Sequence, residues 1–172
     1  ATAKHVVVVG HGTSYGVAHH LAVGLTQLLG TASYVSSGSG DMFDRLATLT
    51  PEDVLVGVGL APYIRHTIQA MDLARARRSV TIAITDSSAS PLVPLADHVF
   101  ITPIDALQYT WSPVGVTWIS NVLLAGVIGH DYERTIEHRT ARDDLMRRFH
   151  AVHDHPPRQV PPSPGRTPGR RR

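Results

Sequence analysis

Short, continuous apolar runs alternate along this chain with longer segments in which apolar residues recur at helical spacing. The clearest run extends from His5 to Gly10 and reads HVVVVG, as expected for a strand buried on both faces of a parallel sheet. Four later runs have the same short, apolar character and are also predicted to be strands. They cover residues 32–36, 53–58, 80–84 and 98–102.

Helical patterns separate the predicted strands. Residues 14–29 carry apolar side chains at a spacing near 3.6 and stop at Gly30, a residue type that commonly terminates helices. Further helical segments are predicted over 41–49 with Asp41 as the cap, near 90–96, and over 62–78, 111–128 and 129–150. Strands that alternate with helices predict βαβ units with right-handed crossovers. The expected fold is a three-layer α/β/α sandwich whose five parallel strands lie in the order 2-1-3-4-5.

The composition fits one domain of ordinary size in residues 1–150. The chain has 172 residues, of which 42% are hydrophobic and 17% charged, so it can bury a core. The absence of cysteine excludes disulfides, thiolate zinc sites and a cysteine nucleophile. No apolar run reaches the roughly 18 residues of a membrane-spanning helix. The N-terminus does not resemble a signal peptide, so we expect a cytoplasmic protein with no membrane partner.

The formal net charge of +2 is unevenly distributed. Residues 1–150 contain 11 Lys and Arg against 13 Asp and Glu, whereas residues 151–172 contain five Arg against Asp154 alone. The second segment also holds six of the twelve prolines and almost no apolar side chains, so it cannot form a packed core. We therefore predict a disordered Pro/Arg-rich tail over 151–172, and no general excess of basic charge in the folded domain.

Candidate chemistry lies in the loops after the strands, because ligands of such sheets bind beyond the carboxyl ends of the strands. The first loop reads GHGTSYG over residues 10–16. Its glycines let a ligand approach the backbone, its hydroxyls donate hydrogen bonds, and the start of the next helix attracts an anion. The spacing matches neither the dinucleotide fingerprint GxGxxG nor a Walker loop. A site for a small phosphate or sugar phosphate and a tight turn capped by Ser14 both remain open.

The loop after the fourth strand is rich in hydroxyl groups. Residues 85–92 read TDSSASPL, which places several hydroxyls and one carboxylate at a strand's carboxyl end. Such groups suit the hydroxyls of a sugar, although they also serve as caps and turn formers. The candidate ligand contacts of this loop are Asp86, Ser87, Ser88 and Ser90.

Three segments carry a resemblance to a known family. They read VVVVGHGTSYGVAHHLA, DVLVGVGLAPYIRHTIQAMDLAR and ITDSSASPLVPLADHVF, and together with the helix WSPVGVTWISNVLLAGVI they resemble a SIS (sugar isomerase) domain over about residues 4–128. The third segment is typical of the effector domains of RpiR/MurR-type transcriptional regulators. The resemblance implies a flavodoxin-like parallel sheet and a phosphosugar site lined by Gly12, Thr13, Ser14, the strand-three loop and the hydroxyls near Ser87 and Ser88.

The strand-three loop departs from the family pattern. The usual form is SxSGxTxE, whose hydroxyls cradle the phosphate, whereas this chain has GLAPYIRH from Gly59 to His66. Tyr63, Arg65 and Thr67 instead resemble a variant found in some regulators. Arg65 can bind phosphate with a bidentate fork, which replaces part of the missing hydroxyls. A solvent-facing arginine at a helix start is the alternative.

Catalysis and metal binding have weaker support. Aldose–ketose isomerisation needs a base, and the usual glutamate is missing from the third loop. The candidate histidines near the loops are His11, His19, His20 and His66. The histidine pairs at 19/20 and 153/155 lack the i, i+4 spacing of a helical zinc site. We therefore assign no catalytic residue, no metal and no cofactor.

These observations lead to a main hypothesis with two alternatives. The chain is expected to bind a phosphorylated sugar or amino sugar as the effector-sensing domain of a transcriptional regulator. DNA would be bound only through a helix-turn-helix domain, which does not precede Lys4 in this chain. A sugar-phosphate isomerase and a degenerate SIS domain used only for dimerisation are the alternatives. A homodimer is expected because SIS domains typically pair and the helix near 112–128 is apolar on more than one face.

Overall fold

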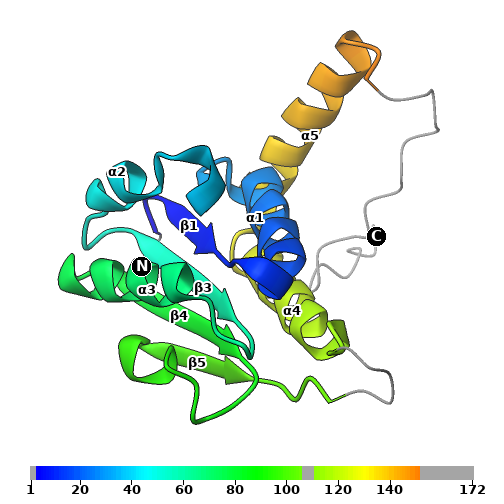
Figure 1. The fold of residues 1–172 in the computed structure, drawn as a ribbon. Helices are drawn as coiled ribbons and strands as arrows, with labels where there is room; N and C mark the ends of the chain where they lie inside the picture. Colours follow the sequence, from blue (N-terminus) through cyan, green and yellow to red (C-terminus); the bar gives the residue numbers. More distant parts are fainter. Residues whose placement is uncertain (1–2, 106–110, 152–172) are drawn as a thin grey trace, which may run out of the picture.

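A computed structural model describes residues 3–105 and 111–151 (Figure 1). Its five strands form one parallel sheet in the order β2-β1-β3-β4-β5, which confirms the predicted topology. The interior strand β1 therefore has β2 on one side and β3 on the other. The strands are β1 (Val6–Val9), β2 (Ala32–Val35), β3 (Val54–Gly59), β4 (Val80–Thr85) and β5 (His98–Ile101).

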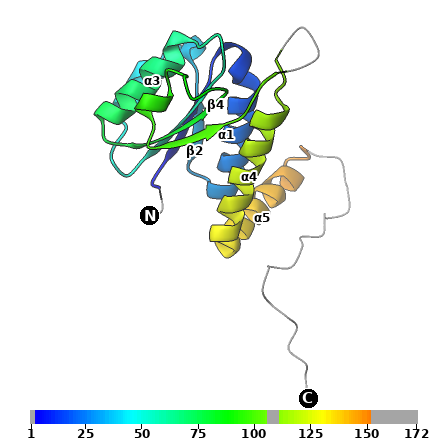
Figure 2. The ribbon, with the colours of Figure 1, turned by 90° about the horizontal axis from the view of Figure 1, so that it is seen from below.

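Helices cover both faces of the sheet (Figure 2). One face carries α1 (Tyr15–Leu29) and α4 (Val114–His130), and α5 (Tyr132–Arg148) packs mainly against α1. The other face carries α2 (Met42–Ala47) and α3 (Arg65–Ala76). The connecting segments contain short 3-10 turns, which are η1 (Gly12–Ser14), η2 (Ser37–Ser39) and η3 (Val93–Leu95). No helix in the described ranges combines the length and apolar character needed to cross a membrane.

The hydrophobic core is divided by the sheet into two parts. Alternate residues of β1 point to opposite faces, so Val6 and Val8 pack with α1, whereas Val7 and Val9 pack with α2 and α3. Glycines in β3 let α3 and the strand-four loop approach closely. A Cβ atom at Gly57 would lie 2.5 Å from Sδ of Met71, and one at Gly59 would lie 2.8 Å from Cδ2 of Leu92. The third strand thus packs closely against α3 at Gly57 and against the loop after β4 at Gly59.

Several predicted boundaries differ from the structure by a few residues. The predicted helix over 62–78 begins at Arg65 instead, because residues 61–64 turn toward the strand-four loop and Ile64 is extended. The predicted end of α1 at Gly30 is confirmed, and that glycine has a φ of 70°. Asp41 occupies the cap position of α2 as predicted, but its carboxylate accepts a hydrogen bond from the Ser39 hydroxyl rather than from a helix amide. The predicted tail lies outside the described residues after Ala151.

Candidate functional site

The predicted site residues lie along the carboxyl edge of the sheet, at the ends of β1, β3 and β4. The strand order reverses at β1, since the chain places β2 on one side of it and then passes to β3 on the other. In this class of sheet, ligands bind beside such a reversal. The amino ends of α1 and α3 flank it from opposite faces of the sheet (Figure 1). The edge therefore presents two helix amino ends, which favour an anion.

The loop after β1 is compact because α1 approaches it closely. A Cβ atom at Gly10 would lie 2.6 Å from Cβ of Ala18. Gly12 has a φ of 60°, a left-handed conformation that favours glycine. In this turn Thr13 is exposed, whereas Ser14 is buried and its hydroxyl does not cap α1. Ser14 thus occupies the N-cap position of α1, as the tight-turn alternative predicted, but its side chain makes no capping hydrogen bond.

The loop after β3 meets the loop after β1. A Cβ atom at Gly12 would lie 3.1 Å from Cγ1 of Ile64, the residue that immediately precedes Arg65. Arg65 is exposed, and no carboxylate pairs with its guanidinium in the described ranges. The chain thus enters α3 at Arg65 directly after a residue that packs against Gly12.

Asp86 joins the loops after β3 and β4. Its Oδ1 accepts a 2.8 Å hydrogen bond from the Tyr63 hydroxyl, and its Oδ2 accepts a 3.2 Å bond from the Ala61 backbone N–H. The neighbouring Thr85 hydroxyl donates to the carbonyl of Gly59 at 2.7 Å. Burial raises the pKa of Tyr63, and its hydrogen bond to the Asp86 carboxylate raises it further. Asp86 and Tyr63 thus organise the loops, and both carboxylate oxygens are engaged.

The serines after β4 form a turn. The Ser87 side chain accepts a hydrogen bond from the backbone N–H of Ala89 at 3.1 Å. The buried Ser90 side chain accepts from the backbone N–H of Leu92 at 3.3 Å. Ser88 is exposed. The Ser87 hydroxyl retains a proton to donate, so its turn role is compatible with a contact to a sugar. The Ser90 hydroxyl is buried and also bonds to the Tyr63 side chain.

His11 is the site residue whose role the sequence did not reveal. Its position near the loops made it one of four candidate bases, but its ring is buried and hydrogen-bonded at both nitrogens. Its partners are the Thr67 hydroxyl and the Ser37 backbone N–H. Burial lowers the pKa of His11, and the nearby His66 lowers it further. The predicted residue Thr67 is also buried, and it meets His11 at the base of the loops.

Tyr34 is a second residue of the site that was not predicted from the sequence. Its hydroxyl donates a 2.6 Å hydrogen bond to the carbonyl of Gly10, so β2 also supports the strand-one loop. Its ring packs edge-on against Tyr15 and His19, with centroid distances of 5.4 and 5.7 Å. A tyrosine in a predicted strand gives no local signal for such a contact.

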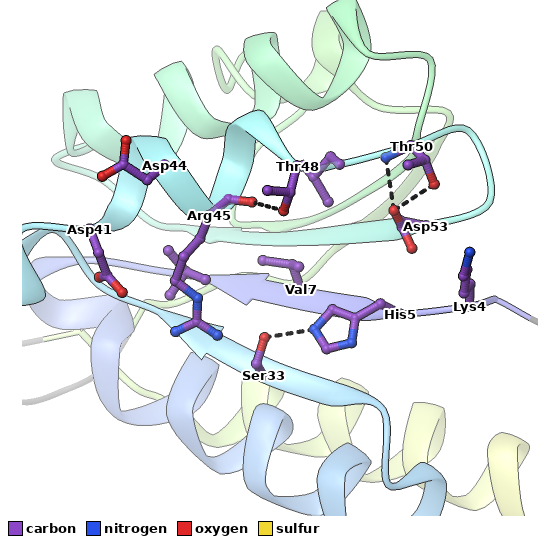
Figure 3. Close-up of a pocket in the computed structure, with 12 residues that line it drawn as sticks. Lys4, His5, Val7, Ser33, Asp41, Asp44, Arg45, Thr48, Thr50 and Asp53 are labelled. Carbon is purple, nitrogen blue, oxygen red and sulfur yellow. Dashed lines mark hydrogen bonds between the residues drawn. The ribbon is translucent and has the colours of Figure 1, made fainter.

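Two larger hollows lie away from the predicted residues. A polar groove of about 780 Å³ runs beneath α2 along β1 and β2 (Figure 3). In it, His5 and Ser33 point toward one another and form a 2.9 Å hydrogen bond. An apolar hollow of about 520 Å³ lies between α1, α4 and the sheet. Neither of these two hollows includes a predicted site residue. No group of three metal-ligating side chains occurs in the part of the chain that the structure describes.

The fold and the site define this chain as a parallel α/β domain with two helix amino ends at the carboxyl edge of its sheet. A family model described as the SIS domain matches residues 1–125. The chain belongs to the SIS domain family, as its resemblance predicted.

Relatives of known structure agree with this assignment. The sugar isomerase domain of an RpiR transcription factor from Sphaerobacter thermophilus is 36% identical, with a TM-score of 0.78, covering 84% of this chain and 80% of that one. The NanR protein of Vibrio vulnificus, complexed with ManNAc-6P, is 19% identical and shares the fold, with a TM-score of 0.74 over 86% of this chain and 57% of its own.

A curated relative is longer than this chain. An uncharacterised HTH-type transcriptional regulator of Haemophilus influenzae is 28% identical over 99 residues, which are 58% of this chain. They amount to 34% of the regulator's length. The match therefore concerns about one third of that protein.

Proposed function

We propose that this domain binds a phosphorylated sugar or amino sugar and serves as the effector-sensing part of a transcriptional regulator. The observation that carries the proposal is the close approach of Gly12 to Ile64, the residue that precedes Arg65, beside the strand-order reversal. Membership of the SIS family supports it, as does the similarity to an RpiR transcription factor over most of the chain. In a regulator, DNA would be bound by a helix-turn-helix domain outside this chain.

The phosphate is proposed to bind at the amino ends of α1 and α3. Arg65 supplies a full positive charge and a planar fork that matches phosphate oxygens. The backbone N–H groups of Gly12 and Thr13 are proposed to donate to the anion at the start of α1, where the helix dipole favours it, whereas the Ser14 N–H bonds to the carbonyl of His11 at 3.2 Å. Gly59, at the end of β3, is proposed to lie at the floor of the site, and Leu92 fills the space that a side chain at this position would need. This arrangement replaces the serines and threonine that the usual third loop supplies.

The sugar is proposed to extend toward the loop after β4. The Ser87, Ser88 and Ser90 hydroxyls and the exposed Thr13 hydroxyl offer donors for sugar oxygens. Asp86 and Tyr63 would contribute by fixing the loop between these groups, since their polar atoms bond to each other.

A thermal-shift and calorimetric comparison tests the proposal. The probes are ManNAc-6P, a panel of other sugar phosphates, and their unphosphorylated parents. A ligand at a hundredfold excess over its Kd should raise the free energy of unfolding by about 2.7 kcal/mol. Arg65→Ala should abolish the preference for the phosphorylated form, whereas Arg77→Ala, at the far end of α3, should leave it unchanged. If no sugar phosphate shifts the melting temperature at millimolar concentration, a domain used only for dimerisation becomes the better explanation.

We also propose that the domain is a homodimer formed through α4. Val114, Trp118 and Val122 recur at every fourth position of this helix and are 71%, 66% and 47% exposed. The opposite side of the same helix is buried, and its residues Val116 and Ile119 belong to the core. A helix that is apolar all round is expected to be covered all round. A second copy of this chain would cover the exposed stripe.

A further inference from the structure

His11 lies beneath the candidate ligand loops rather than at their surface. The residue is 8% exposed, and both of its ring nitrogens are engaged. Nδ1 lies 2.9 Å from Oγ1 of Thr67 in α3, and Nε2 lies 3.2 Å from the backbone nitrogen of Ser37 in η2. One ring thus joins three chain segments that the sequence separates by 56 and 26 residues.

These contacts determine which nitrogen carries the proton. The Ser37 backbone N–H can only donate, so Nε2 must offer its lone pair. A neutral ring then carries its proton on Nδ1 and donates it to Oγ1 of Thr67. Burial lowers the pKa of His11, and the His66 ring, whose centroid is 5.7 Å away, lowers it further. The ring is therefore neutral at neutral pH.

The hydrogen bonds of His11 also fix the two chain segments that are proposed to contact the ligand. Gly12 follows it directly, so fixing the ring also fixes the start of the strand-one turn. Thr67 lies in the first turn of α3, two residues after Arg65, so the same bond fixes the helix start from which the guanidinium extends. Sites of this kind depend on supporting hydrogen bonds that hold the contacting residues in place.

We propose that His11, as the neutral Nδ1–H tautomer, is a positioning residue that holds the Gly12–Ser14 turn, η2 and the start of α3 in their ligand-binding arrangement. This inference rests on the proposed function and adds to it the residue that sets the geometry of the site. His11 itself does not contact the ligand in this scheme. Arg65 and the Gly12–Ser14 turn do.

Substitutions that keep one bond and remove the other test each half of the link. His11→Asn places an amide nitrogen where Nδ1 lies and retains a donor for Thr67, but removes the acceptor for Ser37. His11→Gln places an amide oxygen near the position of Nε2 and retains that acceptor instead. Thr67→Val removes the hydroxyl at nearly constant volume. Thr67→Ser, which keeps the hydroxyl, is the matched control.

Two measurements are needed. The first is the ¹⁵N NMR spectrum of the His11 ring and the backbone amides in the ligand-free protein. We expect an Nδ1–H ring, a Ser37 amide resonance that moves further in His11→Asn than in His11→Gln, and unchanged α5 resonances in both. The second is the Kd of ManNAc-6P. We expect Thr67→Val and His11→Asn to weaken binding about tenfold, the equivalent of roughly one buried hydrogen bond, while Thr67→Ser stays within about twofold of the unsubstituted protein.

The outcomes separate this inference from the proposed function. An Nε2–H ring, or a Ser37 amide that ignores the His11 substitutions, overturns the positioning role even if the unsubstituted protein binds ManNAc-6P. Unchanged affinity in Thr67→Val overturns it as well. If the ring and the amides behave as expected but no sugar phosphate binds, the proposed function fails while the link between the three segments stands.

Discussion

The hydroxyl of Tyr63 donates a 2.8 Å hydrogen bond to Oδ1 of Asp86, and this bond joins the loop after β3 to the loop after β4. The second carboxylate oxygen of Asp86 accepts from the backbone of Ala61 at 3.2 Å. The Asp86 side chain therefore holds Ala61 and Tyr63 beside the loop after β4, and α3 begins after them, at Arg65.

Removing the Tyr63 hydroxyl should weaken this junction. We expect Tyr63→Phe to lower the free energy of unfolding by about 1 kcal/mol, because one partly buried hydrogen bond to a carboxylate is lost. Urea denaturation measures the change. Tyr15→Phe, which removes a hydroxyl from a half-exposed ring, is the control and should change stability by less than about 0.5 kcal/mol. Equal stability of both variants would show that the loops are held without this bond.

Alanine at Gly10 should be destabilising, whereas alanine at Gly16 should not. The new Cβ at position 10 would lie 2.6 Å from Cβ of Ala18, which cannot move without moving α1. We expect a loss of about 1–3 kcal/mol from this overpacking. No atom lies within 4 Å of a Cβ at Gly16, and helical alanine is favoured there by about 0.5–1 kcal/mol. Thermal denaturation of the two variants measures the contrast, and a Gly10→Ala protein as stable as the unsubstituted one would contradict the close packing.

Asp97 should make stability depend on pH in the acid range. Its carboxylate accepts hydrogen bonds from the backbone N–H and the hydroxyl of Thr81 at 2.8 and 2.9 Å, and these bonds lower the pKa of Asp97 in that order of importance. A lowered folded-state pKa stabilises the protein at pH above the unfolded value, about 3.9, and this contribution disappears as pH falls through the folded value.

The measurement for Asp97 is urea denaturation at a series of pH values. Asp97→Asn should lose stability at neutral pH and show a shallower decline below about pH 4 than the unsubstituted protein. Thr81→Val should flatten the decline in the same direction, because it removes one of the two donors. Parallel curves for all three proteins would mean that the carboxylate contributes nothing specific to the folded state.

The exposed stripe on α4 should determine the oligomeric state. We expect Trp118→Glu to convert a dimer to a monomer, since it places a charge in the middle of an apolar surface that the second copy would cover. Sedimentation equilibrium at matched concentrations measures this. Gln69→Glu adds the same charge to the exposed surface of α3, on the other face of the sheet, and should leave the dimer intact. An unsubstituted protein that remains monomeric at high concentration would exclude the interface.

Local patterns were sufficient to predict the sheet. The valines of β1 indicated a buried central strand, and Val8 and Val9 are indeed fully buried. The same reasoning was less informative for β5, which is apolar in sequence and yet exposed at every residue. It lies at the end of the strand order and pairs with β4, so a short apolar run does not reveal whether a strand is central or at an edge.

The candidate site was less predictable because its contacts join distant parts of the chain. The Gly-rich turn and Arg65 could be selected from their residue types and from the family resemblance. The bonds of His11 to Thr67 and of Asp86 to Ala61 leave no periodic signal, since the paired residues are 56 and 25 positions apart. Polar residues in loops can therefore be located from sequence before their partners can be identified.

The contact between Gly10 and Ala18 has a consequence for how this sequence can vary among organisms. Because the backbone at position 10 lies against the first methyl group of position 18, neither site can enlarge alone. Alanine at position 10 should be tolerated in a protein whose position 18 is already glycine, because the methyl group that it would meet is then absent. The two positions are therefore expected to change together in natural sequences, as a coupled pair that would be recognisable in an alignment even where the rest of the strand-one loop has diverged.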